Sequence, residues 1–222
     1  MEEINVYYKV EREFHDADDF EEFYGYKYPA GILDGSYGIT STIRQMLYAG
    51  DEDDTYVILV NILESLNFDI RCNILDVASG YYPAFGYEIA GRQLQLNKGT
   101  VTCIDPRIVV DKPFFNNVKL VKENFTDMYD LSNYDLIVSS LPCEITEELF
   151  RAVMNSGKPF FICPCNCHSN KIGKKLWEEM YEFCLDYEKK HGMENKTKIF
   201  REKVYYKYDY IDATKNSILY RK

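Results

Sequence analysis

The 222-residue sequence lacks any run of 18 or more apolar residues, and its opening lacks both a basic segment and an apolar one. A helix that crosses a bilayer needs about 20 consecutive apolar residues. A secretory signal peptide needs a positively charged segment followed by an apolar segment. We therefore expect no membrane span and no signal peptide. Hydrophobic residues still make up 46% of the chain, which is enough to build one domain with a substantial core.

Two motifs that define common protein classes are also missing. The glycine fingerprint G-x-G-x-x-G is absent, which argues against a nicotinamide-dependent dehydrogenase. The seven cysteines include no C-x-x-C pair. Their number is odd and several lie in apolar runs, so we expect reduced thiols in a cytoplasmic protein rather than a disulfide framework.

One cluster of cysteines requires a separate interpretation. Cys163, Cys165 and Cys167 alternate along a predicted strand and therefore point to one face, next to His168. Zinc needs about four ligands that converge in a tetrahedron, which alternating residues on a strand do poorly. We expect no metal here and interpret the thiols as small buried side chains at a strand end. A nucleophilic pair of Cys165 and His168 is the alternative.

Charge is distributed unevenly along the chain, which has a net charge of −10. Residues 1–54 hold 14 acids and 4 bases, whereas residues 55–222 hold 22 of each. The last stretch, 189–222, is basic, with 10 bases and 4 acids. The acidic part disfavours general nucleic-acid binding, although the basic end could meet a phosphate or could simply be a solvated face. We predict an acidic, aromatic N-terminal extension over 1–54, which forms a lid or acceptor pocket, and a single domain over 55–222.

Strand-like and helix-like segments alternate from about residue 70 onward. After a helix at 51–68, the pattern predicts five strands, at 72–79, 100–106, 117–125, 134–142 and 159–165. Helices are predicted at 83–95, 144–157 and 172–192, and two β-rich runs at 197–212 and 216–222 suggest a terminal hairpin. Strands that alternate with helices predict a Rossmann-like α/β fold. Its doubly wound, mostly parallel sheet would carry helices on both faces and an antiparallel C-terminal hairpin.

The turn after the first predicted strand suggests a binding site. That strand ends at Asp76 and is followed by Val-Ala-Ser-Gly-Tyr-Tyr-Pro. Ala78 and Gly80 carry little or no side chain, so a ligand could approach the backbone there. Ligands of open parallel sheets bind beyond the carboxyl ends of the strands. The alternative is an ordinary turn in which Asp76 caps the next helix.

The pattern Asp76-x-Ala78-x-Gly80 resembles motif I of the class I S-adenosylmethionine-dependent methyltransferases, an acid followed by x-Gly-x-Gly-x-Gly. In that superfamily the acid and the glycine turn hold the methionine part of the cofactor. Ala78 stands where the family has its first glycine, and Tyr82 where it has the third. Tyr82 could cover the cofactor, or it could close the pocket.

Further segments resemble the same superfamily in the same order. Asp105, at the tip of the second strand, resembles the acid that accepts hydrogen bonds from both ribose hydroxyls, a task that suits the acceptor capacity of a carboxylate. Asn124 would pair with the adenine amine, and Phe125 would cover the adenine ring. The fourth predicted strand begins Tyr-Asp, as is common in the family, and the final run resembles its last strand. The resemblance thus implies that the cofactor contacts are Asp76, Ala78, Gly80, Tyr81, Asp105, Asn124 and Phe125.

The loop after the fourth strand faces the transferred methyl group in this superfamily, so Ser140 and Cys143 are the candidate catalytic residues. Methyl transfer needs mainly alignment of the reacting atoms, and a base only where the nucleophile must lose a proton. Residues 76–90 with the 134–153 segment also resemble a small group of uncharacterised archaeal methyltransferase-like proteins. The Pro-Cys-Asn-Cys-His run at 164–168 is similar to a Pro-Cys-Cys-x-His strand end in a group that includes a tRNA methyltransferase.

The sequence therefore predicts a methyltransferase that uses S-adenosylmethionine, with a small or planar acceptor favoured by the tyrosines of the N-terminal segment. RNA remains a possible acceptor that we do not favour, and the sequence defines no oligomeric state. The alternative hypothesis is a non-catalytic binding or interaction module on the same fold, because two of the three motif I glycines are replaced.

Overall fold

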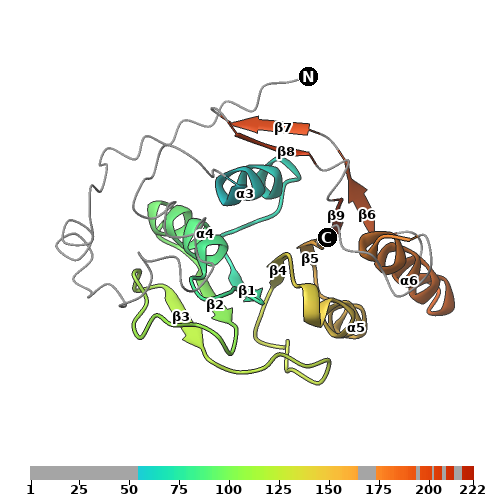
Figure 1. Ribbon diagram of the computed structural model, residues 1–222, viewed down its shortest axis with the longest axis horizontal. Coiled ribbons are helices and arrows are strands. Elements are labelled where there is room, and N and C mark those ends of the chain that lie inside the picture. The colour runs from blue at the N-terminus through green and yellow to red at the C-terminus, as the bar shows by residue number, and fades with distance from the viewer. Residues whose placement is uncertain (1–54, 165–173, 194–195, 202, 207–208, 213–216) are drawn as a thin grey trace.

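A computed structural model describes residues 55–164, 174–193, 196–201, 203–206, 209–212 and 217–222 (Figure 1). The predicted N-terminal extension over 1–54 lies outside the described residues. So do Cys165, Cys167 and His168, on which the prediction for the cysteine cluster depends.

A seven-stranded sheet forms the centre of the domain, with strand order β3-β2-β1-β4-β5-β9-β6. The first five strands run parallel to one another, and β9 runs antiparallel to both β5 and β6. This arrangement confirms the predicted mostly parallel α/β sheet. The strands are β1 (Asn73–Val77), β2 (Thr100–Ile104), β3 (Val118–Val121), β4 (Leu136–Ser140), β5 (Phe160–Cys163), β6 (Lys198–Phe200) and β9 (Ile218–Arg221).

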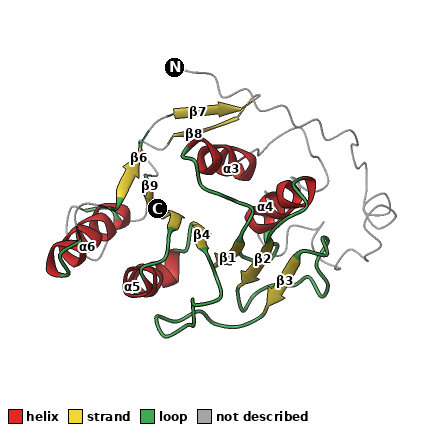
Figure 2. Cartoon of the chain, turned by 180° about the vertical axis from the view of Figure 1, so that it is seen from behind, coloured by secondary structure: helices red, strands yellow, loops and turns green. Residues whose placement is uncertain are grey.

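Helices cover both faces of this sheet (Figures 1 and 2). On one face lie α3 (Thr55–Ser65) and α4 (Ala84–Gln95). On the other lie α5 (Thr146–Ser156), which follows the short 3₁₀ turn η1 (Cys143–Ile145), and α6 (Leu176–Lys190). None of the described helices has the length and apolar character that crossing a bilayer requires.

The strands read as continuous apolar runs because both sides of the sheet are buried. In β1 the first residue is exposed and the next four are buried. Ile74 belongs to the apolar cluster beneath α3 and α4, whereas Leu75 and Val77 belong to the cluster beneath α5 and α6. Because successive side chains of a strand point to opposite faces, the side chains of β1 contribute to both apolar clusters.

The C-terminal β-rich region divides between two sheets. β7 (Lys203–Tyr206) and β8 (Asp209–Asp212) form a separate antiparallel pair beside α3 (Figure 1). The predicted hairpin between the runs 197–212 and 216–222 is confirmed by β6 and β9, which pair antiparallel. The last run of the sequence instead enters the main sheet as β9, between β5 and β6. Arg221 anchors it, because its buried guanidinium donates hydrogen bonds to the carbonyl oxygens of Val153 (2.9 Å) and Lys158 (3.1 Å).

The strand order reverses between β1 and β4. From β1 the chain continues to β2 on one side, and from β4 it continues to β5 on the other. The hydroxyl of Ser139 in β4 donates a hydrogen bond of 2.6 Å to the carbonyl oxygen of Val77, which ties the two strands together at this point. In open α/β sheets the crevice at such a reversal is where ligands bind.

Candidate functional site

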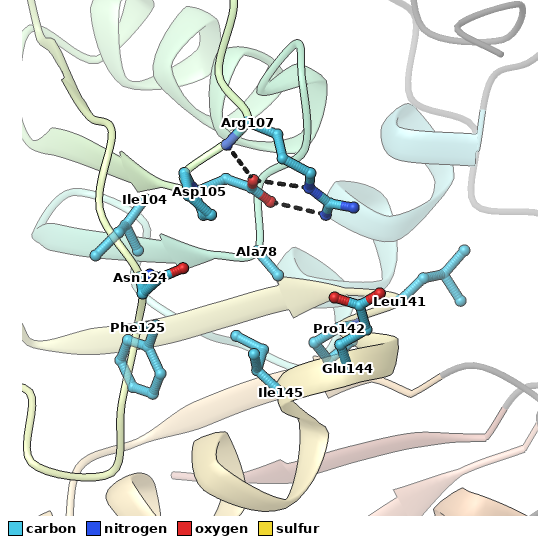
Figure 3. A pocket seen from close by; sticks show the side chains of 11 residues that line it. Ala78, Ile104, Asp105, Arg107, Asn124, Phe125, Leu141, Pro142, Glu144 and Ile145 are labelled. Carbon is cyan, nitrogen blue, oxygen red and sulfur yellow. Dashed lines mark hydrogen bonds and ion pairs between the residues drawn. The ribbon is translucent and has the colours of Figure 1, made fainter. Parts of the chain in front are cut away.

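A pocket of about 230 Å³ opens at the carboxyl ends of the parallel strands, where the strand order reverses (Figure 3). Its walls come from the loops that follow β1, β2, β3 and β4. Four residues predicted from three segments of the sequence line it together, namely Ala78, Asp105, Asn124 and Phe125. Neighbouring parallel strands bring their carboxyl ends to one edge, so distant segments meet here.

Asp105 is the buried anionic group of the pocket, with only 2% of its surface exposed. Its Oδ1 accepts hydrogen bonds from the Arg107 backbone N–H (2.8 Å) and Nε (3.0 Å). Its Oδ2 accepts from Arg107 Nη2 (3.1 Å) and from the Gly80 backbone N–H (3.0 Å). Burial alone would raise the pKa of Asp105, but these bonds outweigh it and lower the pKa below the usual value. Asp105 is therefore a carboxylate at neutral pH.

Two residues on opposite walls of the pocket have a left-handed backbone without being glycine. Ala78 after β1 has φ of 57°, and Leu141 after β4 has φ of 56°. Each costs roughly 1–2 kcal/mol relative to a relaxed backbone. Strain of this kind persists where a surrounding structure demands it and is concentrated at functional sites. Its presence on both sides of the strand-order reversal supports a functional assignment of this pocket.

Gly80 and Tyr81 support the pocket from behind rather than lining it. Gly80 has φ of 78°, which a glycine adopts without cost. Through its N–H it fixes the β1–α4 turn to Asp105. The ring of Tyr81 lies beneath the guanidinium of Arg107, with 5.6 Å between the guanidinium carbon and the ring centroid.

Asp76 lies deeper than the sequence suggested. Its side chain is 1% exposed, faces α4, and accepts a hydrogen bond of 3.0 Å from the Gly86 backbone N–H through Oδ2. It is not among the residues that line the pocket. Burial, reinforced by the charge of Asp105, raises the pKa of Asp76 to about 8, although the Gly86 hydrogen bond lowers it. At neutral pH this carboxyl is therefore mostly protonated.

Glycine at position 86 makes this close approach possible. A β-carbon there would lie 2.4 Å from the Sγ of Cys103 and 3.0 Å from Oδ2 of Asp76. The helix α4 can therefore press against β1 and β2 only because residue 86 has no side chain.

Three buried polar atoms of the β1–α4 segment have no hydrogen-bond partner among the described residues. They are Oδ1 of Asp76, Oγ of Ser79 and the hydroxyl of Tyr82. Buried polar atoms are paired in the great majority of cases, by protein, water or ligand. A polar ligand group at this turn would supply the missing partners. Tyr82 itself is buried and is not among the residues that line the pocket.

The β3 loop contributes an apolar surface and an amide. Phe125 is buried and packs against Tyr129 with 5.4 Å between ring centroids, whereas Asn124 is exposed at the pocket wall. An aromatic face beside an amide suits a planar heterocycle with exocyclic polar groups.

The two candidate catalytic residues differ in position. Ser140 is the half-buried last residue of β4, paired with Cys163 of β5, and it does not line the pocket. Cys143 begins η1, and its side chain lies outside what the structure describes. The loop instead presents Leu141, Pro142, Glu144 and Ile145 to the pocket.

Sequence reasoning missed two charged residues of the pocket, Arg107 and Glu144. The signal for Arg107 was its place two residues after Asp105, because an aspartate readily binds the backbone N–H two residues on. Glu144 is an exposed acid at the opposite wall (Figure 3). No comparable signal marked Glu144.

Metal ligands do not gather in the part of the chain that the structure describes, where no group of three His, Cys, Asp or Glu side chains is placed to hold an ion. Cys163 is buried at the end of β5, and burial raises the pKa of its thiol to about 12. This thiol is therefore uncharged at neutral pH.

No protein-family model and no curated protein matches the chain. Solved structures that resemble it include several methyltransferases. One from Aquifex aeolicus is 15% identical, with 77% of this chain and 93% of that chain covered and a TM-score of 0.49. The precorrin-6y C5,15-methyltransferase from Geobacter metallireducens is 11% identical, with coverages of 77% and 86% and a TM-score of 0.42. The 23S rRNA methyltransferase ErmE is 13% identical, with coverages of 77% and 68% and a TM-score of 0.43.

These proteins act on chemically different acceptors, a small molecule in one case and ribosomal RNA in another. Identities of 15% or less and TM-scores below 0.5 transfer neither an activity nor an acceptor to this chain.

Proposed function

We propose that this protein is a methyltransferase that binds S-adenosylmethionine at the carboxyl ends of β1, β2 and β3. The observation that supports the proposal most directly is the meeting of Ala78, Asp105, Asn124 and Phe125 in one pocket. The resemblance assigns them to the cofactor from three segments of the sequence, which follow β1, β2 and β3.

The residues that line the pocket fit the adenosine part of such a cofactor. The pocket offers a buried carboxylate for a pair of sugar hydroxyls and an aromatic side chain beside an amide for a purine. Behind it, the unpartnered atoms of Asp76, Ser79 and Tyr82 lie in the segment that would meet the polar methionine portion.

In this proposal the chain acts mainly by binding and orienting. When bound, the cofactor would supply a methyl group activated by a sulfonium. Asp105 would hold the ribose, and Phe125 and Asn124 would hold the adenine. Gly80 would keep the Asp105 carboxylate in place through its N–H. Pre-aligned reactants can save about 7–11 kcal/mol of barrier in favourable systems, so positioning alone can carry much of a methyl transfer.

A small or planar acceptor is our proposal for the second substrate, as the tyrosine-rich N-terminal segment predicts. Ser140 and Cys143 stay our candidates for contacts near the transferred methyl group, because they flank the loop that borders the pocket.

Calorimetric titration with S-adenosylhomocysteine tests the proposal. We expect micromolar binding that weakens at least about 10-fold in Asp105→Asn, because hydrogen bonds to a charged acceptor contribute roughly 1.5–3 kcal/mol. The matched control is Asp69→Asn, since Asp69 holds Arg71 by similar bonds on the exposed surface. Absence of binding at millimolar ligand, or equal loss in both variants, would refute the cofactor assignment.

A further inference from the structure

The carboxylate of Asp105 already has a full set of hydrogen-bond donors in the structure. A carboxylate offers about four acceptor positions. Asp105 fills them with two backbone donors, from Gly80 and Arg107, and with two side-chain donors, Nε and Nη2 of Arg107. A ligand hydroxyl can therefore reach this carboxylate only by displacing a donor.

The four donors differ in how easily they can leave. The two N–H groups belong to the backbone of the β1 and β2 loops and are fixed by the fold. The guanidinium of Arg107 is on a flexible side chain that is 52% exposed, and it can rotate away without any change in the backbone. When the guanidinium rotates away, Asp105 loses two hydrogen-bond donors at once, because Nε and Nη2 belong to the same planar group.

A vicinal diol is the ligand group that replaces this fork one for one. Two adjacent hydroxyls present two donors, so exchange with Nε and Nη2 leaves Asp105 with four donors again. A single hydroxyl would leave one acceptor position of a buried carboxylate without its donor, which is unfavourable.

A second acid lines the same pocket as Arg107. Glu144 lies on the opposite wall of the pocket and faces Arg107 (Figure 3). The Tyr81 ring beneath the guanidinium would remain beside it as it turns.

The same Asp-x-Arg unit occurs a second time in the chain without these features. Arg71 binds Asp69 through its backbone N–H, Nε and Nη2, as Arg107 binds Asp105. Asp69 is 58% exposed, however, and does not line the pocket. The unit is thus a local motif, and only its copy at residues 105–107 joins a buried carboxylate to a cavity.

We propose that Arg107 is a displaceable latch: it occupies Asp105 in the free protein and transfers to Glu144 when a vicinal diol takes its place. This inference rests on the proposed function, which supplies the diol as the ribose of the cofactor. The latch lowers the affinity for the ligand by the free energy of the interaction that must be broken.

Calorimetry with adenosine and S-adenosylhomocysteine, combined with a double-mutant cycle, tests the latch. Arg107→Ala is expected to tighten binding of both ligands about 2- to 5-fold, which corresponds to the loss of a partly exposed ion pair. Glu144→Gln should weaken binding about 2- to 3-fold in the wild-type background and leave it unchanged in Arg107→Ala. Arg71→Ala is the matched control and should change neither ligand. Thermal melts establish that each variant is folded.

Weaker binding in Arg107→Ala would mean that Arg107 contacts the ligand, and it would overturn the latch. An equal effect of Glu144→Gln in both backgrounds would overturn the transfer to Glu144.

A second measurement separates the latch from the cofactor assignment, namely the NMR signal of the Arg107 Nε–H group in the ligand-free protein. The latch requires a slowly exchanging signal that Asp105→Asn abolishes; a fast-exchanging signal refutes the latch even if the nucleoside binds. The Nε–H signal can also exchange slowly while neither ligand binds at millimolar concentration. In that case the ion pair exists, but both the proposed function and the latch are refuted.

Discussion

Replacement of Asp76 by asparagine should remove a large pH dependence of stability. The pKa of Asp76 is raised from 3.8 to about 8 in the folded protein, mainly by burial. Between these values the folded state keeps a proton that the unfolded state releases. Because the unfolded state then binds fewer protons, stability falls as pH rises through this window. The asparagine side chain would keep the shape and the acceptor for the Gly86 N–H but would not titrate.

The magnitude follows from the width of that window. One proton of difference corresponds to ~1.4 kcal/mol per pH unit. Between pH 5.5 and 7.5 the wild type should therefore lose about 2–3 kcal/mol relative to Asp76→Asn. This is a large fraction of the ~5–15 kcal/mol that stabilises a typical domain.

Urea denaturation at several pH values provides the assay. The single tryptophan, Trp177, is buried in α6 and reports unfolding by fluorescence. Asp111→Asn removes the same charge at an exposed position and is expected to follow the wild-type curve. Parallel stability curves for wild type and Asp76→Asn would show that Asp76 is ionised in the folded protein, and would refute the account of its burial.

Further predictions concern the turn and the helix around the site. Gly86→Ala should destabilise the protein by about 1–3 kcal/mol or more, because the added methyl meets Sγ of Cys103. Adding Cys103→Ala to the same chain should recover part of that loss. Purely additive effects of the two substitutions in urea titrations would contradict this explanation. Gly80→Ala should cost about 1 kcal/mol through backbone strain alone, because nothing lies within 4 Å of the added carbon. Ala78→Gly should gain about 0.5–1 kcal/mol by relieving strain at φ of 57°, and a loss in the same titrations would show that Ala78 is relaxed.

The strands near the pocket could be predicted from sequence because each is a short, doubly buried apolar run. The predicted strand at 72–79 contains β1, and the one at 100–106 contains β2. Apolar character says little about where such a run ends: the strand predicted over 117–125 stops at Val121, and the remainder turns into the pocket wall.

The side to which Asp76 points could not be predicted. When both faces of a strand are buried, alternation of polar and apolar residues disappears, and with it the sequence signal for orientation. The pairing register sets the direction of the side chain. Asp76 pairs with Cys103 of β2 and Val138 of β4, and its side chain lies on the α4 side. Arg107 could have been found from its place two residues after Asp105, because the Asp-x-Arg unit is a local motif.

The position of β9 sets an order in which the edge of the main sheet can open. β6 joins that sheet through β9, and β9 is held in turn by β5 and by the guanidinium of Arg221. Any fluctuation that releases β9 must also free β6, whereas β6 can detach alone. In amide hydrogen exchange, protection should therefore rise from β6 to β9 and then to β5. Arg221→Met should bring the exchange of β6 and β9 closer together, while β1 and β4, which frame the pocket, keep their protection.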